Sequence, residues 1–209
     1  MAFFRDIIEG RVPYKLLDKR AMFCIDFENW RPYLDNRGIQ IDWRAFHTLA
    51  HGMFRTVDLF YYEGMLTWSF FLHCNSNSPK PAYYRAKKRR EQYQRELKSF
   101  GYTVRSKPIQ RIHTGFHRDS RAETGQYKCN CDVEMTIDVM DNLRSYDVFV
   151  LCTGDGDFVP LAKRIKAELK EVWAVSIENR MNSHLREAVS RYLYLNNMIQ
   201  FMPSLTRKK

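Results

Sequence analysis

Short apolar runs alternate along this chain with longer stretches that have a helical period. The first run, residues 21–25, carries no charge and ends at Asp26, as a strand buried on both faces and leading into a loop would. Further strands are predicted over residues 57–62, 102–107, 147–152, 171–177 and 198–202. Helices are predicted between them, over residues 43–55, 81–100, 132–144, 157–169 and 182–192. Asp42 can cap the first of these helices, and Gly101 ends the second.

This alternation of strands and helices predicts the fold class. It is typical of an α/β protein with a doubly wound, mainly parallel sheet of about five to six strands and helices on both faces, as in PIN-like and Rossmann-like folds. A chain of 209 residues favours a single domain. We expect an N-terminal extension over residues 1–19, the domain over residues 20–205 and a basic tail over residues 206–209.

One segment lacks a clear period. Residues 108–128 are rich in basic side chains and contain Arg111, Arg118 and Arg121. We interpret this segment as a long loop, and loops of such length commonly carry function. Because it immediately precedes Asp132, it is predicted to act as a substrate clamp.

Composition narrows the class of protein. Hydrophobic residues make up 44% of the chain and aromatic residues 14%, which is typical of a globular protein. No apolar run is long enough for a membrane span or a signal peptide, so a cytoplasmic protein without membrane contact is expected. The five cysteines suit a reducing compartment, and Cys129 and Cys131 are interpreted as ordinary buried thiols rather than zinc ligands.

The net charge of +10 favours a polyanionic partner, although a basic surface can equally serve only solubility. Within the helix predicted over residues 81–100, basic side chains mix with tyrosines, a combination suited to phosphate contact and base stacking. About half of that helix is expected to be a solvated face. These residues are Tyr83, Tyr84, Arg85, Lys87, Lys88, Arg89, Arg90 and Tyr93.

Aspartates follow two of the predicted strands. Asp26 ends the first, and Asp155 and Asp157 follow the strand at residues 147–152. The carboxyl ends of strands in a doubly wound sheet meet at one crevice, so these side chains are expected to lie together. Gly156 between the pair is expected to allow a tight turn with positive φ.

Asp132 is predicted to join them. At about 100° per residue it lies on the same helical arc as Met135, Val139 and Leu143, which points to the core. The acidic residues elsewhere on this helix, Glu134, Asp138 and Asp141, are interpreted as a solvated face.

Four carboxylates in one pocket would repel each other strongly, so a cation is expected there. Mg²⁺ or Mn²⁺ would neutralise them and could activate water for phosphodiester hydrolysis. The simpler reading of each aspartate alone is a turn or capping residue. Other enzyme classes fit less well, since Glu28 stands where a haloacid-dehalogenase phosphatase needs an aspartate, and neither a dinucleotide fingerprint nor a nucleophile elbow is present.

Three segments together resemble the NYN domain family, the LabA-like branch of the PIN-like nucleases, over residues 20–205. They are Asp26-Phe27-Glu28-Asn29 after the first strand, Cys131-Asp132-Val133 at a helix start, and Thr153-Gly154-Asp155-Gly156-Asp157-Phe158 followed by Pro160-Leu161. The resemblance implies divalent-metal ribonuclease chemistry with Asp26, Asp132, Asp155 and Asp157 as metal ligands and catalytic residues. It also implies that Asn29 positions metal or phosphate.

The sequence departs from the family pattern in two places. The family's Lys-Gly-x-Asp is replaced by Lys128-Cys129-Asn130-Cys131 before Asp132, with the lysine displaced by one and no glycine. Ala188 is followed by Val189 instead of an aspartate. Lys128 is retained with Asn29 and the arginines of residues 108–128 as a candidate substrate contact.

The sequence therefore predicts a metal-dependent nuclease with RNA favoured over DNA as substrate. The alternative is a regulatory module of the same fold that binds nucleic acid or a protein without cutting, and a homo-oligomer is left open.

Overall fold

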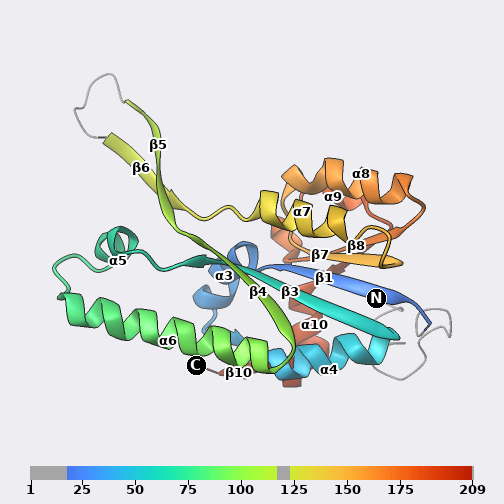
Figure 1. Ribbon diagram of the computed structural model, residues 1–209, viewed down its shortest axis with the longest axis horizontal. Coiled ribbons are helices and arrows are strands. Elements are labelled where there is room, and N and C mark those ends of the chain that lie inside the picture. Colours follow the sequence, from blue (N-terminus) through green and yellow to red (C-terminus); the bar gives the residue numbers. More distant parts are fainter. Residues whose placement is uncertain (1–17, 117–122, 209) are drawn as a thin grey trace.

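A computed structural model describes residues 18–116 and 123–208 of the chain (Figure 1). Its centre is a six-stranded sheet in the order β4-β3-β1-β7-β8-β9, and every neighbouring pair in it is parallel. The strands are β1 (Arg20–Asp26), β3 (Thr56–Met65), β4 (Tyr102–Pro108), β7 (Val148–Cys152), β8 (Glu171–Ser176) and β9 (Arg191–Tyr194). The strand order runs outward in both directions from β1, which confirms the predicted doubly wound sheet.

Helices cover both faces of this sheet, as predicted. One face carries α7 (Asp132–Asp141), α8 (Val159–Ala167) and α9 (Ser183–Ala188), and the other carries α3 (Phe27–Asn36), α4 (Trp43–Met53), α6 (Lys80–Ser99) and α10 (Leu195–Phe201) (Figure 1). Alternate residues of β1 point to opposite faces of the sheet. Phe23 packs in the hydrophobic core on the α4 side, and Met22 and Cys24 pack in the core on the side of α7 and α8. A strand buried on both faces reads as an unbroken apolar run, which is why β1 is recognisable in the sequence.

The ends of several helices follow the predicted local chemistry. Asp42 caps α4, and its Oδ1 accepts hydrogen bonds from the backbone nitrogens of Arg44 and Ala45, both at 3.1 Å. Gly101 follows α6 with a φ of 92°, a conformation that glycine adopts at little cost.

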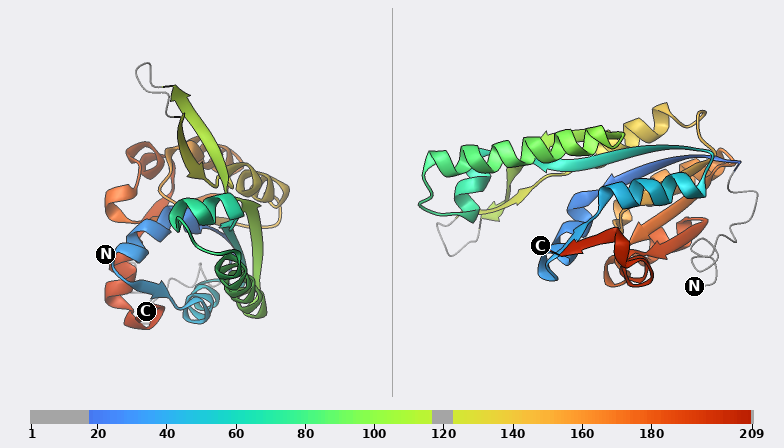
Figure 2. Two further views of the ribbon diagram at one scale, coloured as in Figure 1. Left: turned by 90° about the vertical axis from the view of Figure 1, so that its left-hand side faces the viewer. Right: turned by 90° about the horizontal axis from the view of Figure 1, so that it is seen from below.

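The segment at residues 108–128, predicted to be a loop, contains a hairpin instead. Its strands β5 (Gln110–Phe116) and β6 (Glu123–Lys128) pair antiparallel with each other and with no strand of the main sheet in the described part of the chain. The hairpin projects from the body of the molecule on the same side as the short helix α5 (Trp68–Cys74) (Figures 1 and 2). The sequence of these two strands carries no strong alternation of apolar and polar residues, which is why the prediction failed there.

Two further predictions were wrong in detail. The helix expected over residues 182–192 ends at Ala188, and Arg191–Tyr194 form the edge strand β9. The last predicted strand lies inside α10, where Leu195 and Met198 are buried at a helical spacing. Within the segment named the basic tail, β10 (Thr206–Lys208) pairs antiparallel with β2 (Ile39–Ile41).

The loop expected after Asp26 is also absent, because α3 begins at the next residue. Asp26 is the residue before the helix, and its carboxylate accepts a hydrogen bond from the backbone nitrogen of Asn29 at 3.4 Å. The prediction missed α3 because its polar residues and Pro32 mask its two buried positions, Trp30 and Leu34. Among the described residues, the helices are all too short or too polar to cross a membrane.

Candidate metal centre

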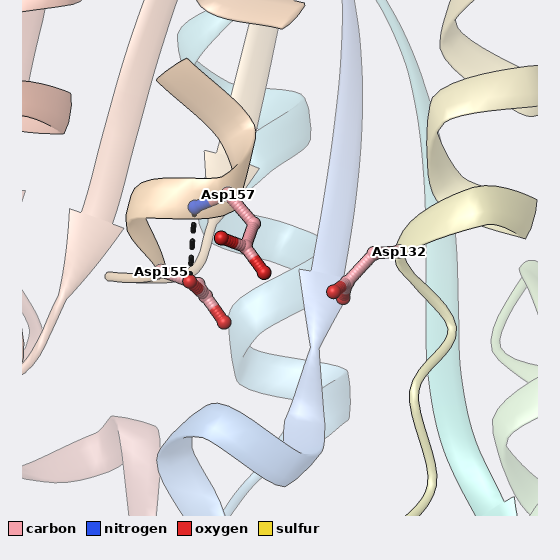
Figure 3. A group of neighbouring side chains, drawn as sticks. All are labelled: Asp132, Asp155 and Asp157. Carbon is pink, nitrogen blue, oxygen red and sulfur yellow. Dashed lines mark hydrogen bonds between the residues drawn. The ribbon is translucent and has the colours of Figure 1, made fainter. Parts of the chain in front are cut away.

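Three aspartates meet beside the carboxyl end of β7, a strand at the middle of the sheet. Asp155 and Asp157 lie in the turn after β7, and Asp132 is the first residue of α7. One carboxylate oxygen of each lies within 4.8 Å of the corresponding oxygens of the other two. Figure 3 shows Asp155 and Asp157 approaching from one side and Asp132 from the other. A group with three oxygen donors at this separation fits a hard divalent cation such as Mg²⁺ or Mn²⁺.

Asp26 lies beside this group but more deeply in the protein. Its Oδ2 accepts a hydrogen bond from the hydroxyl of Thr153 at 3.0 Å. Burial raises the pKa of Asp26 from an ordinary 3.8 to about 7, the Thr153 hydrogen bond opposes that rise, and the charge of Asp132 adds to it. The structure therefore brings three of the four predicted aspartates into one group and places Asp26 next to them in a different environment.

Thr153 connects Asp26 to the turn. Its side chain is fully buried, and its Oγ1 donates to Asp26 while accepting from the backbone nitrogen of Asp155 at 3.3 Å. Asp155 in turn accepts from the backbone nitrogen of Asp157 at 3.0 Å, the bond drawn in Figure 3. These bonds order the backbone of the turn and hold the carboxylate of Asp155 in a defined direction.

The two glycines of the turn are required by close packing. A Cβ on Gly154 would lie 2.3 Å from Oγ of Ser176 and 2.4 Å from the carbonyl oxygen of Arg180. A Cβ on Gly156 would lie 2.6 Å from Nδ2 of Asn182. The positive φ predicted for Gly156 is wrong, because glycine is needed there for space and not for its backbone conformation.

Helix α7 presents Asp132 as the helical arc predicted. Met135, Val139 and Leu143 are buried on that arc, and the backbone nitrogen of Asp132 donates to Oδ1 of Asn130 at 2.8 Å. The helix's N-terminal end also favours a carboxylate electrostatically.

The solvated face predicted for the other acids of α7 is only partly correct. Asp141 is exposed. Asp138, however, accepts from Tyr62 at 2.9 Å and pairs with Arg105 at 2.9 Å, and Glu134 pairs with Lys107 at 2.8 Å. Tertiary partners on β3 and β4 therefore hold Asp138 and Glu134.

Asp26, Asp132 and Asp155 border a cleft of about 290 Å³. Its remaining walls carry amide, thiol, aromatic and guanidinium groups. The lining residues are Asp26, Glu28, Asn29, Tyr127, Cys129, Asn130, Asp132, Asp155 and Arg180.

Cys129 and Cys131 are not the ordinary buried thiols that were expected. Both are partly exposed, their sulfur atoms lie 3.7 Å apart, and Cys129 lines the cleft. The hydrogen bond from Cys131 lowers the pKa of Cys129, while the same contact, together with burial, raises the pKa of Cys131.

The predicted substrate contacts have different positions. Asn29 lines the cleft, and its Oδ1 accepts from the backbone nitrogen of Gly154 at 3.1 Å, so it also braces the turn. Arg111 lies on β5 and is exposed. Lys128 ends β6, while Arg118 and Arg121 lie outside the described residues.

Five residues that line the cleft were not among the predicted site residues: Glu28, Tyr127, Cys129, Asn130 and Arg180. Arg180 follows β8, and the rule that ligands bind where strands of such sheets end could have indicated it. Tyr127 is on β6, and only the fold of the hairpin brings it to the cleft.

The raised pKa of Asp26 predicts how stability depends on pH in the metal-free protein. The folded protein holds this proton up to about pH 7, whereas the unfolded chain releases it near pH 3.8. The stability that comes from the bound proton is therefore complete below about pH 4. It decreases as pH rises, and it is lost once pH has passed through 7. In EDTA, the wild type should lose roughly 2–3 kcal/mol relative to Asp26→Asn between pH 5 and pH 8. Urea unfolding at both pH values measures this difference.

The exposed Asp141 supplies the control, because Asp141→Asn should track the wild type at both pH values. A difference between the wild type and Asp26→Asn that does not change with pH would contradict the assignment.

Comparisons with known proteins agree with this architecture. The NYN domain model matches residues 20–196 of the chain. The "Low amplitude and bright protein LabA" of Synechococcus elongatus is 33% identical over 111 residues, which are 53% of this chain and 58% of that protein. The chain thus spans little more than half of that relative. A crystal structure of a protein of unknown function from Vibrio parahaemolyticus has the same fold, with a TM-score of 0.57 at 19% identity, over 86% of this chain and 94% of that one.

Proposed function

Because the chain belongs to the NYN domain family, we propose that it is a divalent-metal-dependent nuclease that hydrolyses phosphodiester bonds in RNA. The observation that carries the proposal is the convergence of Asp132, Asp155 and Asp157 from two separate elements onto one point. Asp26 borders the same cleft and completes the acidic set.

The electrostatics of this cluster favour a bound cation. Two unit charges 4 Å apart repel by about 4 kcal/mol at an effective dielectric constant of 20, and three carboxylates contain three such pairs. A fold that keeps these side chains together gains most when a divalent cation binds between them. When bound, Mg²⁺ or Mn²⁺ supplies Lewis-acid polarisation of a phosphoryl oxygen and lowers the pKa of water.

The residues of this chain then have separate tasks. Asp132, Asp155 and Asp157 hold the cation and set its distance from the substrate phosphate. Asp26, whose pKa is about 7, is suited to accept a proton near neutral pH and orients Thr153 behind the turn. Arg180 on the cleft wall is placed to contact a phosphate of the substrate.

Substrate binding would continue onto the hairpin. Arg111 and Lys128 lie on its two strands, and Arg118 and Arg121 belong to the same segment of the sequence. The net charge of +10 favours a polyanion, and the open cleft suits a flexible single strand. We therefore propose RNA ahead of DNA as the substrate.

A cleavage assay tests this proposal. Purified full-length chain is incubated with end-labelled single-stranded RNA, duplex RNA and single-stranded DNA in Mg²⁺, in Mn²⁺ and in EDTA. We expect RNA to be cut in Mg²⁺ or Mn²⁺, no cleavage in EDTA, and recovery when the cation is added back, because the carboxylates alone provide no electrophile.

The double variant Asp155→Asn/Asp157→Asn is the matched control and should not cut in either cation. Cleavage that survives EDTA or this double variant would overturn the mechanism. If the wild type cuts none of the three substrates but shifts RNA on a native gel, the protein is a binding module of the same fold.

A further inference from the structure

Tyr127 of β6 is the aromatic side chain that borders the acidic cleft. Its ring is partly exposed and packs against α5, with centroids 4.8 Å from the ring of His73 and 5.5 Å from that of Phe70. The ring is thus held by α5 and still reaches the cleft that contains Asp132 and Asp155.

The support beneath Tyr127 is itself anchored. Trp68 and Phe71 of α5 pack on Tyr83 of α6, at centroid distances of 5.3 and 5.6 Å. Thr67, which caps α5, donates from its hydroxyl to the carbonyl oxygen of Ile109 at 3.0 Å, just where the hairpin starts. An aromatic ring held in this way loses little conformational entropy when a ligand packs on it.

The hairpin's pairing adds a cation near the ring. Tyr127 is directly opposite Arg111 in the register of β5 and β6, and opposite residues of an antiparallel pair project from the same face. A second arginine, Arg180, follows β8 and also lines the cleft. The cleft therefore combines carboxylates, the guanidinium group of Arg180 and one flat aromatic surface, with Arg111 opposite that aromatic residue in the hairpin.

We propose that Tyr127 is a stacking platform for one unpaired base of the nucleic-acid substrate, and that it makes the cleft select single strands over duplexes. The proposal rests on the proposed function, since it assigns a binding site to the base that neighbours the phosphate bound at the carboxylates. A base in a duplex is covered on both faces by its neighbours, so only an unpaired base can stack on a side chain.

The test measures binding apart from cleavage. The double variant Asp155→Asn/Asp157→Asn serves as background, and a fluorescein-labelled oligoribonucleotide of eight uridines, alone or annealed to its complement, is the probe. Each uridine of the single strand is replaced in turn by an abasic nucleotide. With Tyr127 present, one abasic position should weaken binding by about 5- to 150-fold, the loss of one stacked base.

In the Tyr127→Leu protein the same abasic position should weaken binding by less than about two-fold, because the ring on which the missing base would stack has already been removed. Tyr127→Phe keeps the ring and should restore the abasic penalty, and the exposed Tyr192→Leu on β9 is the matched control. Equal abasic penalties in the background protein and in its Tyr127→Leu derivative would overturn the platform, and so would a Tyr127→Leu loss that is as large for the duplex as for the single strand.

Failure of the proposed function would be recognised separately. If the wild-type chain cuts no RNA in Mg²⁺ or Mn²⁺, the nuclease proposal falls. The binding experiment tests the stacking role of Tyr127 in either case, because it measures binding by a variant that does not need to cut RNA.

Discussion

Asparagine in place of Asp132 should lower kcat/KM for RNA cleavage by about a thousand-fold or more. Asp132 supplies the carboxylate that reaches the group from the α7 side, opposite Asp155 and Asp157. Asparagine has nearly the same shape as aspartate but is neutral, so the substitution removes a negative charge that would attract the cation. Loss of several kcal/mol of transition-state stabilisation corresponds to that factor. Steady-state kinetics in Mg²⁺ measure the loss, and calorimetric titration with Mn²⁺ should show weaker metal binding.

Asp141→Asn is the matched control for this substitution, because it changes an exposed aspartate on the same helix. It should retain wild-type kinetics. In EDTA the Asp132→Asn protein should be at least as stable as the wild type, since one repelling charge has been removed. An Asp132→Asn protein that is folded and still cuts at a rate near that of the wild type would exclude the proposed centre.

Replacing Glu63 by alanine should lower the free energy of unfolding by about 3 kcal/mol. Glu63 is 2% exposed on β3, and its carboxylate holds Arg90 at 3.0 Å and Gln94 at 2.6 Å on α6, with Arg31 of α3 at 3.9 Å. Removing one partner of a buried ion pair typically costs 3–5 kcal/mol because the other charge remains without compensation. We expect the lower end of this range because the Arg90 side chain is 19% exposed, so water partly compensates its charge when Glu63 is removed.

Chemical denaturation of Glu63→Ala and of the double variant Glu63→Leu/Arg90→Met measures the effect. The double variant should recover most of the lost stability, because an apolar pair of similar volume replaces both charges. If Glu63→Ala is as stable as the wild type, or if the double variant is the less stable of the two, the ion pair does not hold α6 on the sheet. The sulfur of Cys131, the residue just before α7, also contacts the carbonyl oxygen of Glu63 at 3.9 Å, so β3 lies against the start of the helix that carries Asp132.

The parts of the fold that were predicted correctly have a short-range signal. The central strands are buried on both faces and appear as apolar runs, and α4 begins at a capping aspartate. Where the signal depends on distant partners the prediction failed: β9 has two exposed residues and is ordered by its pairing with β8, and β5 and β6 pair with each other outside the main sheet.

The candidate site divides in the same way. Asp26 and the turn at Asp155 and Asp157 were found because residues that follow parallel strands meet at one edge of the sheet. Asp132 was found because helical geometry turns it toward Met135 and Val139. Tyr127 was missed because no local pattern distinguishes it from other surface residues, and Arg180 was missed although it follows β8 at the edge where the strands end.

The sequence by itself determined the central strands β1, β3, β4, β7 and β8, the helices α4, α6, α7 and α8, and the positions where carboxylates follow them, because burial on two faces, capping and helical period act over a few neighbouring residues. Only the tertiary structure decided which charges meet. It pairs Asp138 with Arg105, places Asp26 behind the three-carboxylate group and brings Tyr127 from the hairpin to the cleft. Contacts of this kind join residues far apart in the chain, and their energies depend on distance and burial, which exist only once the sheet and its helices have packed.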